Sequence, residues 1–187
     1  ALGWAAHQAT AINYKVIRFS DILLLAAEAE IEVGSLSQAE DYVNMVRARA
    51  ANPLYWVHTY IDTDDPSKGF TNVPAANYKI ELYPSGQFEA NGQDYARRAV
   101  RFERKIELAM EGHRFFDLQR WDNGTGYMAD VLNAYISHEN NVAGYNGQIL
   151  KAATFTKGKN ELYPIPQNQI DLSKQGGSST LIQNPNY

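Results

Sequence analysis

Two stretches near the start of the chain show apolar and charged patterns that predict a pair of helices. The segment 22–33 is rich in leucine, alanine and glutamate, and its second half alternates with period two. That alternation is typical of a strand, but these residue types favour helix over strand. Ser20 is a candidate N-cap, and Gly34 is a natural C-terminal stop. We therefore predict a first helix that ends at Gly34.

A second helix is predicted directly after it. Ser37 and Glu40 have the spacing of a capping box, in which the serine starts the helix and the glutamate bonds back to it. Apolar residues then recur at helical spacing: Ala39, Val43, Val46 and Ala50. Asn52 followed by Pro53 ends the pattern. Residues 20–51 are thus a predicted helical hairpin with a three-residue turn.

One such hairpin is similar to a single tetratricopeptide-type unit. A single unit does not bury both of its faces, and about three copies are usually needed. The sequence shows no second copy of the pattern. Either the rest of the chain covers the hairpin, or the chain is the C-terminal piece of a longer protein.

Residues 54–93 lack helical periodicity, and turn-forming residues gather at 62–69 and 91–92. Seven aromatic residues are spread through this aromatic loop region: Tyr55, Trp56, Tyr60, Phe70, Tyr78, Tyr83 and Phe88. Loops of this length are usually functional or disordered, and the many rings argue against disorder.

The longest predicted helix runs from Asp94 to Glu111. Its predicted apolar face consists of Ala99, Phe102, Ile106, Ala109 and Met110. Its charges are segregated, with one flank basic (Arg97, Arg101, Lys105) and the other acidic (Glu103, Glu107, Glu111). Like charges four residues apart repel each other, so both flanks need partners elsewhere in the fold. The candidate partners of the acidic flank are Arg18, Arg47, Arg49, Arg114 and Arg120.

Gly112 separates this helix from a further predicted helix, His113–Trp121, which is apolar all round and is therefore expected to be buried. A turn at 123–126 leads to a helix over 128–137. Residues 94–137 form the predicted helical core, and residues 138–187 are expected to be irregular because Gly, Asn, Ser and Pro are frequent there. The predicted fold class is mostly α: a tetratricopeptide-like helical hairpin plus packed helices with long irregular loops.

Composition limits the possible functions. The 187 residues are 44% hydrophobic and 20% charged, which indicates one globular domain. The net charge of -4 argues against nucleic acid as a partner. The longest strongly apolar run, 22–27, is too short to cross a bilayer. Cysteine is absent, and the first residues are no signal peptide, so an export signal or lipid anchor would lie upstream.

The sequence contains few residues or motifs that indicate catalysis. The glutamates of the acidic flank could supply the two carboxyls of a glycosidase, but neighbouring arginines lower carboxyl pKa values rather than raise one. An ion-pair network is the favoured interpretation, and a hydrolase is the weakest alternative. The four histidines form no zinc motif, and no nucleophile elbow or phosphate-binding loop is present. We expect no catalytic residue, no metal and no cofactor.

The aromatic residues are the most informative feature, because they make up 12% of the chain. Sugar rings have apolar C–H faces surrounded by hydroxyls, and flat aromatic side chains suit such faces. Tyr55, Trp56 and Tyr60 form the densest group and are the candidate ligand-binding residues. The alternative is that these rings only fix a long loop to the helices.

Several motifs together resemble the C-terminal half of the SusD/RagB family. Residues 101–121 read RFERKIELAMEGHRFFDLQRW, where the family typically reads R-x-E-R-R-I-E-L-A-F-E-G-H-R-F-F-D-L-R-R-W. Residues 18–29 and 46–50 resemble two further family helix motifs. Residues 162–170 and 183–187 resemble its terminal signature, with Asn186 in place of the usual glycine. The resemblance covers about residues 14–187.

This resemblance implies a lipid-anchored protein on the outer-membrane surface of Bacteroidota. Such a protein captures glycans, or in some members peptides, for import through a SusC-like TonB-dependent transporter, and it does no chemistry. The resemblance also implies an N-terminal half of the same protein, with the lipid anchor, outside this chain. A peptide-binding member of the family or a helical-repeat protein-interaction module is the alternative. The matching motifs are scaffold motifs, so they identify no ligand-contacting residue.

Overall fold

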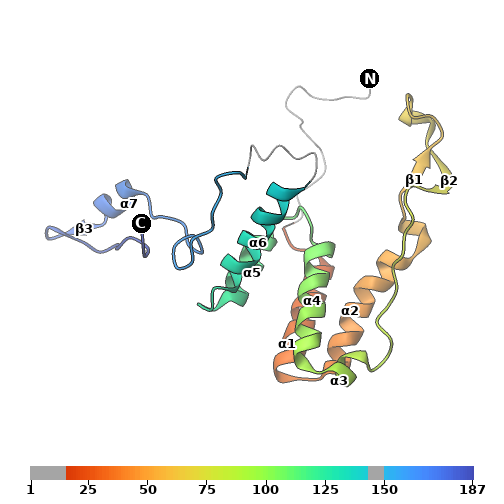
Figure 1. Ribbon diagram of the computed structural model, residues 1–187, viewed down its shortest axis with the longest axis horizontal. Helices are drawn as coiled ribbons and strands as arrows, with labels where there is room; N and C mark the ends of the chain where they lie inside the picture. Colours follow the sequence, from red (N-terminus) through yellow and green to blue (C-terminus); the bar gives the residue numbers. More distant parts are fainter. Residues whose placement is uncertain (1–15, 143–149) are drawn as a thin grey trace. The chain divides into compact units, whose positions relative to one another are not determined.

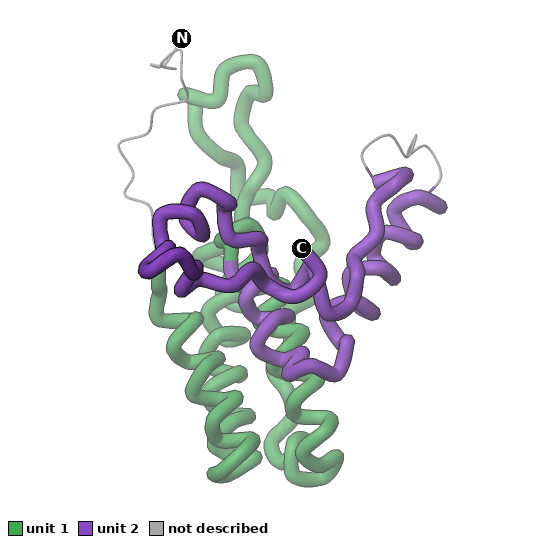
Figure 2. The backbone as a smooth tube through the Cα atoms, turned by 90° about the vertical axis from the view of Figure 1, so that its left-hand side faces the viewer, with its two compact units in different colours: residues 1–112 green, residues 113–187 purple. Residues whose placement is uncertain are grey.

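The computed structural model describes residues 16–142 and 150–187, and the chain divides into two compact units, 1–112 and 113–187 (Figure 2). Most of the described residues with regular structure are helical, which confirms the predicted mostly-α class. The boundary between the units falls inside the predicted helical core 94–137. The tetratricopeptide-like character of the hairpin stays a prediction.

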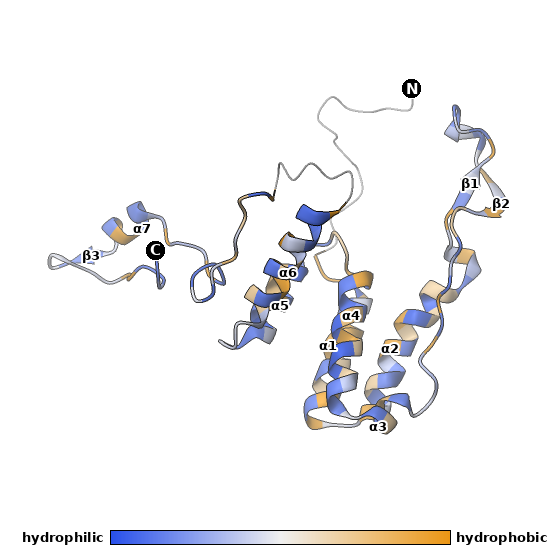
Figure 3. Ribbon diagram, viewed as in Figure 1, coloured by the Kyte–Doolittle hydropathy of each residue, from blue (hydrophilic) through white to orange (hydrophobic). Residues whose placement is uncertain are grey.

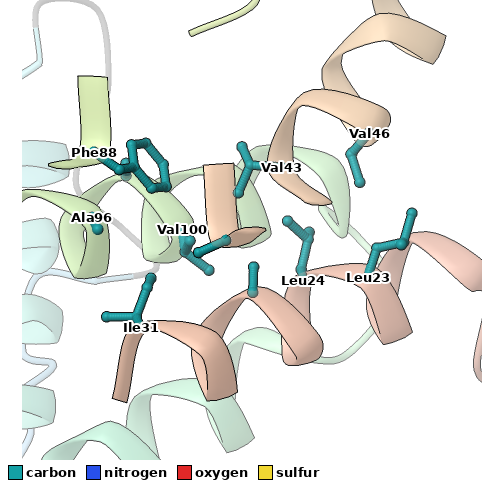
Figure 4. Packing of buried hydrophobic residues seen from close by; sticks show 11 residues of the cluster. Leu23, Leu24, Ile31, Val43, Val46, Phe88, Ala96 and Val100 are labelled. Atoms are coloured by element: carbon teal, nitrogen blue, oxygen red, sulfur yellow. The ribbon is translucent and has the colours of Figure 1, made fainter. Parts of the chain in front are cut away.

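Three helices form the body of unit 1: α1 (Phe19–Val33), α2 (Leu36–Ala51) and α4 (Gln93–Glu107). They lie side by side, and the short helix α3 (Gln87–Asn91) lies at one end (Figure 1). Their buried side chains form a single cluster, whose largest members point toward one another in Figure 4. This cluster consists of Leu23, Leu24, Ala27, Ile31, Ala39, Val43, Val46, Phe88, Ala96, Ala99 and Val100. The predicted apolar stripe of the second helix is thus confirmed at three of its four positions.

The structure corrects both predicted N-caps. The N-cap of helix α1 is Arg18, two residues before the predicted Ser20, so Ser20 lies inside the helix. Helix α2 is capped by Ser35, whose hydroxyl accepts a hydrogen bond from the backbone N–H of Gln38. Ser37 is therefore no cap, and only two residues separate α1 from α2. The sequence contains two serines two positions apart, and the capping-box spacing selected the wrong one.

Glu40 has a different role from the one its spacing suggested. Its carboxylate is buried and accepts hydrogen bonds from the backbone N–H groups of Gly86 (2.9 Å) and Phe88 (2.8 Å). These groups belong to the first turn of α3, where backbone N–H groups lack partners within the helix. Glu40 thus caps a helix that lies more than 40 residues further along the chain.

Two further α2 side chains bind the backbone of the same returning segment. The Asn44 side chain exchanges two hydrogen bonds with the backbone of Tyr83, at 3.0 and 2.8 Å. Arg47 donates to the carbonyl oxygen of Glu81 through Nε. Glu40, Asn44 and Arg47 follow one another at helical spacing, so one face of α2 holds the segment 81–88 in place.

Helix α4 is shorter than predicted, and of its predicted apolar face Ala99 is buried while the larger residues are exposed. The helix ends at Glu107, and Met110 has a positive φ of 66° and is fully exposed. Phe102 and Ile106 are 54% and 47% exposed. The buried face instead carries small apolar residues together with Glu103 and Arg104. The pattern misled because the largest apolar residues of this helix do not face its core.

The sequence suggested that the aromatic loop region lacks regular structure, but the structure shows that it contains some. It contains the antiparallel strands β1 (His58–Tyr60) and β2 (Phe70–Pro74), which form a hairpin that projects beyond the end of α2 (Figure 1). Two single 3₁₀ turns, Pro53–Tyr55 and Pro66–Lys68, lie before β1 and before β2. Thr59 and Thr71 face each other across the two strands with hydroxyl oxygens 2.6 Å apart.

Unit 2 begins with α5 (Arg114–Asp122) and α6 (Tyr127–Asn141), which pack together. Leu118 is buried as expected, but Phe116 is exposed, so α5 is not buried all round. The region 138–187 is also more regular than predicted. It contains the end of α6, then α7 (Gln167–Leu172) and the short antiparallel strands β3 (Lys174–Gln175) and β4 (Ser178–Ser179).

No helix in the ranges 16–142 and 150–187 is both long enough and apolar enough to cross a membrane.

A first prediction concerns Glu40. Glu40→Ala should lower the free energy of unfolding by about 2 kcal/mol, because two buried N–H groups lose their acceptor. Chemical denaturation followed by far-UV circular dichroism measures this. Asp41→Ala is the matched control, since Asp41 is the next residue on the same helix and is exposed. Equal stabilities of the two variants would contradict the capping role of Glu40.

Candidate functional site

The three predicted ligand-binding residues lie on the segment that leads from α2 into the hairpin. Tyr55 lies in the first 3₁₀ turn and is 66% exposed, Trp56 follows it and is half-buried, and Tyr60 lies in β1 and is 44% exposed. Among the described residues, no ring stacks on Tyr55. The structure therefore places the three rings on one segment but does not stack them on one another.

Trp56 is fixed by two contacts. Its indole Nε1–H donates to the carbonyl oxygen of Ala50 at the end of α2 (3.0 Å). Its ring stacks on Tyr78, with centroids 4.9 Å apart and planes 28° apart. One ring face and the polar edge are thus used to fix the loop, which agrees with the structural interpretation of this residue. The other parts of the half-buried ring remain accessible.

Tyr60 stacks on Phe70 across the hairpin, with centroids 4.9 Å apart and planes 24° apart. Phe70 is itself more than half exposed. The hairpin therefore carries a pair of aromatic rings on its surface. Phe70 is not among the residues singled out by sequence, because its pairing with Tyr60 depends on the strand register. The alternation of β-favouring residues around 57–60 and 70–73 was the available signal.

A groove of about 330 Å³ lies between α2, α4 and the segment before Tyr83. Its lining residues are Arg47, Ala50, Lys79, Ile80, Phe102, Glu103, Ile106 and Glu107. The sequence did not indicate this groove, because its walls come from three separate stretches of the chain. In this groove the exposed side chains of Phe102 and Ile106 lie among charged groups.

The glutamates of α4 form ion pairs with arginines of α1 and α2. Arg47 contacts Glu103 (2.7 Å), Arg49 contacts Glu107 (2.7 Å), and Arg18 contacts both Glu107 and Glu111 (2.5 and 2.7 Å). Three of the five predicted partners of the acidic flank are thereby confirmed. The other two lie in unit 2, where Arg120 contacts Asp117 (2.9 Å).

Burial and pairing act on these groups in opposite directions. Burial raises the pKa of Glu103, and the hydrogen bond from Arg47 opposes that shift. Hydrogen bonds to Glu111 and Glu107 raise the pKa of the Arg18 guanidinium, against the effect of its burial. A further pair, Arg104 with Asp21 (2.8 Å), is buried on both sides and joins α4 to the start of α1. The glutamates are therefore bound to cations within the scaffold.

Unit 2 contains a pocket of its own, of about 320 Å³. Its lining residues are Gln119, Asp122, Asn123, Gly124, Lys157, Gly158, Lys159, Glu161 and Leu162. Several of its polar groups already have partners: Asp122 accepts from the backbone N–H groups of Gly124 and Met128, and Lys157 donates to the carbonyl oxygen of Thr125. Its lining contains no aromatic ring.

Metal binding finds no support in the part of the chain that the structure describes. No group of three or more His, Cys, Asp or Glu side chains there has the geometry to hold an ion. The acidic turn at 62–65 has internal partners, because Asp62 accepts from Lys68 and from the backbone N–H groups of Asp64 and Asp65. These bonds lower the pKa of Asp62, and the hydrogen bond from Lys68 has the largest effect.

The chain is similar to proteins of a known family over most of its length. The family model described as the SusD family matches residues 5–187. SusD-like protein P2 of Formosa agariphila is 29% identical over 177 residues, which are 94% of this chain and 26% of that protein. SusD-like protein P25 of the same organism is 33% identical over 121 residues, which are 64% of this chain and 16% of that protein. The chain thus spans about a quarter or less of the length of these relatives.

A second prediction tests the structural role of the acidic flank. Glu107→Gln should lower the free energy of unfolding by about 1–2 kcal/mol, because Arg49 loses its carboxylate partner and Arg18 loses one of two. Denaturant titration measures the change. Asp94→Asn is the matched control, since Asp94 lies on the same helix and its side chain is 82% exposed. A Glu107→Gln protein with normal stability and altered ligand preference would contradict a purely structural role.

Proposed function

Because the chain belongs to the SusD family, we propose that it is part of a non-catalytic protein that binds glycans at the cell surface. The glycans would be delivered to a SusC-like TonB-dependent transporter in the outer membrane. The observation that carries the proposal is the exposed aromatic surface of unit 1, formed by Tyr55 and by the Tyr60–Phe70 pair. Trp56 adds a partly accessible ring that its own contacts hold rigid.

Rigid, exposed rings suit carbohydrate binding for a physical reason. A ring that is already held in place loses little conformational entropy when a sugar stacks on it. Trp56 is fixed by its bond to Ala50 and by Tyr78, and Tyr60 is fixed by Phe70. The contacts that hold these rings to the scaffold therefore also prepare them to bind a ligand.

A peptide ligand is the second candidate. Within residues 16–142 and 150–187, the hairpin is a sheet of two strands, and each strand has one edge without a strand partner. An extended peptide binds such an edge through backbone hydrogen bonds. A peptide-binding family member, or a helical-repeat protein-interaction module, would use this edge or a helix face in place of the aromatic rings.

We also propose that the rest of a longer protein covers one face of α1. Apolar residues recur along that helix with heptad spacing: Phe19, Ile22, Ala26, Ala29 and Val33. Most of them are exposed, and Val33 is 90% exposed. Figure 3 shows hydrophobic and hydrophilic residues interspersed along α1. The small alanines in the middle of this stripe leave room for a neighbouring helix. This supports a partner in the N-terminal half of the same protein, which would also carry the lipid anchor.

A third prediction tests glycan binding. Tyr55→Ala and Tyr60→Ala should each weaken binding of a polysaccharide about tenfold, because each removes a stacking ring. Intrinsic tryptophan fluorescence, titrated with a panel of plant and host polysaccharides, measures the affinity. Tyr135→Ala is the control, since Tyr135 is an exposed tyrosine on α6 in unit 2. Chromatography of the mixtures should show no shortened products.

The outcomes separate the candidate functions. Release of new reducing ends would contradict a non-catalytic protein and favour a hydrolase. Binding of unstructured peptides, with no response to any polysaccharide, would favour the peptide-binding alternative. Glycan binding that is unchanged in Tyr55→Ala, Tyr60→Ala and Trp56→Ala would exclude these rings from the binding site.

A fourth prediction tests the covered face of α1. Ile22→Glu should lower the melting temperature of the protein isolated from its source, where the remaining helices would be present. The same change should leave the 187-residue chain almost unaffected, because Ile22 is already exposed there. Differential scanning calorimetry of both forms measures this. Equal effects in the two forms would mean that nothing outside this chain covers the stripe.

A further inference from the structure

The groove between α2 and α4 combines apolar and charged walls in equal number. Ala50, Ile80, Phe102 and Ile106 are apolar, and Arg47, Lys79, Glu103 and Glu107 are charged. Its volume of about 330 Å³ lies at the lower end of the range of small-molecule sites, roughly 300–1,000 Å³. A purely apolar partner would bury charged groups without compensation, which is costly. A ligand with apolar faces and hydroxyl edges matches the lining better.

The polar groups of the groove are held in fixed positions. The Arg47 guanidinium contacts Glu103 (2.7 Å), donates to the Glu81 carbonyl oxygen and lies over the Tyr83 ring, 4.9 Å from its centroid. Glu107 is held by Arg49. Side chains with fixed rotamers lose little entropy when a ligand binds to their remaining lone pairs and N–H groups.

Lys79 differs from these groups. It is exposed at the edge of the groove, and among the described residues its ammonium group forms no ion pair or hydrogen bond. A lysine ammonium carries three donors on a flexible stem. It is therefore able to turn toward an oxygen substituent of a ligand in the groove.

The groove also shares a wall with the Trp56–Tyr78 pair. Ala50 lines the groove and accepts the indole hydrogen bond of Trp56. Tyr78 stacks on Trp56 and directly precedes Lys79, which lines the groove. The stacked rings and the groove are therefore neighbours within one unit, built on the same end of α2.

We propose that this groove binds one sugar residue of a glycan, and that the adjacent sugar residue of the same glycan lies against Trp56. Phe102 provides the apolar platform, Arg47 and Glu103 contact hydroxyls, and Lys79 donates to an oxygen substituent. This inference rests on the proposed glycan-binding function and extends it, because it adds the groove as a second contact site for the same glycan. The affinity then depends on chain length.

The test uses fragments of one to six sugar residues, prepared by partial acid hydrolysis of the polysaccharide that binds in the fluorescence titration. Calorimetry should show an affinity for the wild-type protein that rises with fragment length. Phe102→Ala should weaken the longest fragments about tenfold and the single sugar less than twofold. Phe116→Ala is the matched control, because Phe116 is a similarly exposed ring on α5 in unit 2.

A direct readout comes from NMR of isoleucine methyl groups. The methyl signals of Ile80 and Ile106, which line the groove, should shift with the long fragments, and that of the buried Ile31 should not. Glycan binding in which Phe102→Ala matches the wild type and neither signal moves would overturn this inference and leave the proposed function intact. Failure of every polysaccharide to bind would overturn both.

Discussion

The buried charges on α4 are the constraint on which the structure of unit 1 depends. The face of this helix that packs into the core has only small apolar residues at one end and carries Glu103 and Arg104 at the other. Taking such groups out of water is costly unless each meets an opposite charge. Arg47 and Asp21 meet that requirement from α2 and α1, respectively. The helices therefore have little freedom to slide along one another, since a shift of one turn would separate the pairs.

The same pairs also organise the surface. Arg47 contacts Glu103 on one side, and the backbone and ring of the returning segment on the other. One guanidinium thus joins two helices to the stretch that forms the outer wall of the groove. The groove, the Trp56–Tyr78 pair and the hairpin all begin from this end of α2. The proposed binding surface is made largely of loop and is held in place by the helices beneath it.

The long helices were predictable because their periodicity and stop signals are local, whereas the short helices α3 and α7 were not predicted. The stripe of Ala39, Val43 and Val46 is buried as its spacing indicated, and charge alone indicated three arginine partners of the acidic flank correctly. The apolar face of α4 was not predictable, because the exposed Phe102 and Ile106 are larger apolar residues than those that are buried. The candidate site was predictable only as a segment rich in rings. The stacking of Tyr60 on Phe70 and the groove behind Trp56 depend on contacts between distant stretches, which no local pattern contains.

The backbone bonds from Glu40, Asn44 and Arg47 fasten the returning segment at its base, so the chain between them and the end of α2 forms a closed excursion. The cost of closing such a loop rises only slowly with its length. The hairpin tip can therefore be lengthened, shortened or exchanged without disturbing the helical body. Over evolution, the proposed recognition surface is therefore free to change within the excursion while the helices keep the fold unchanged.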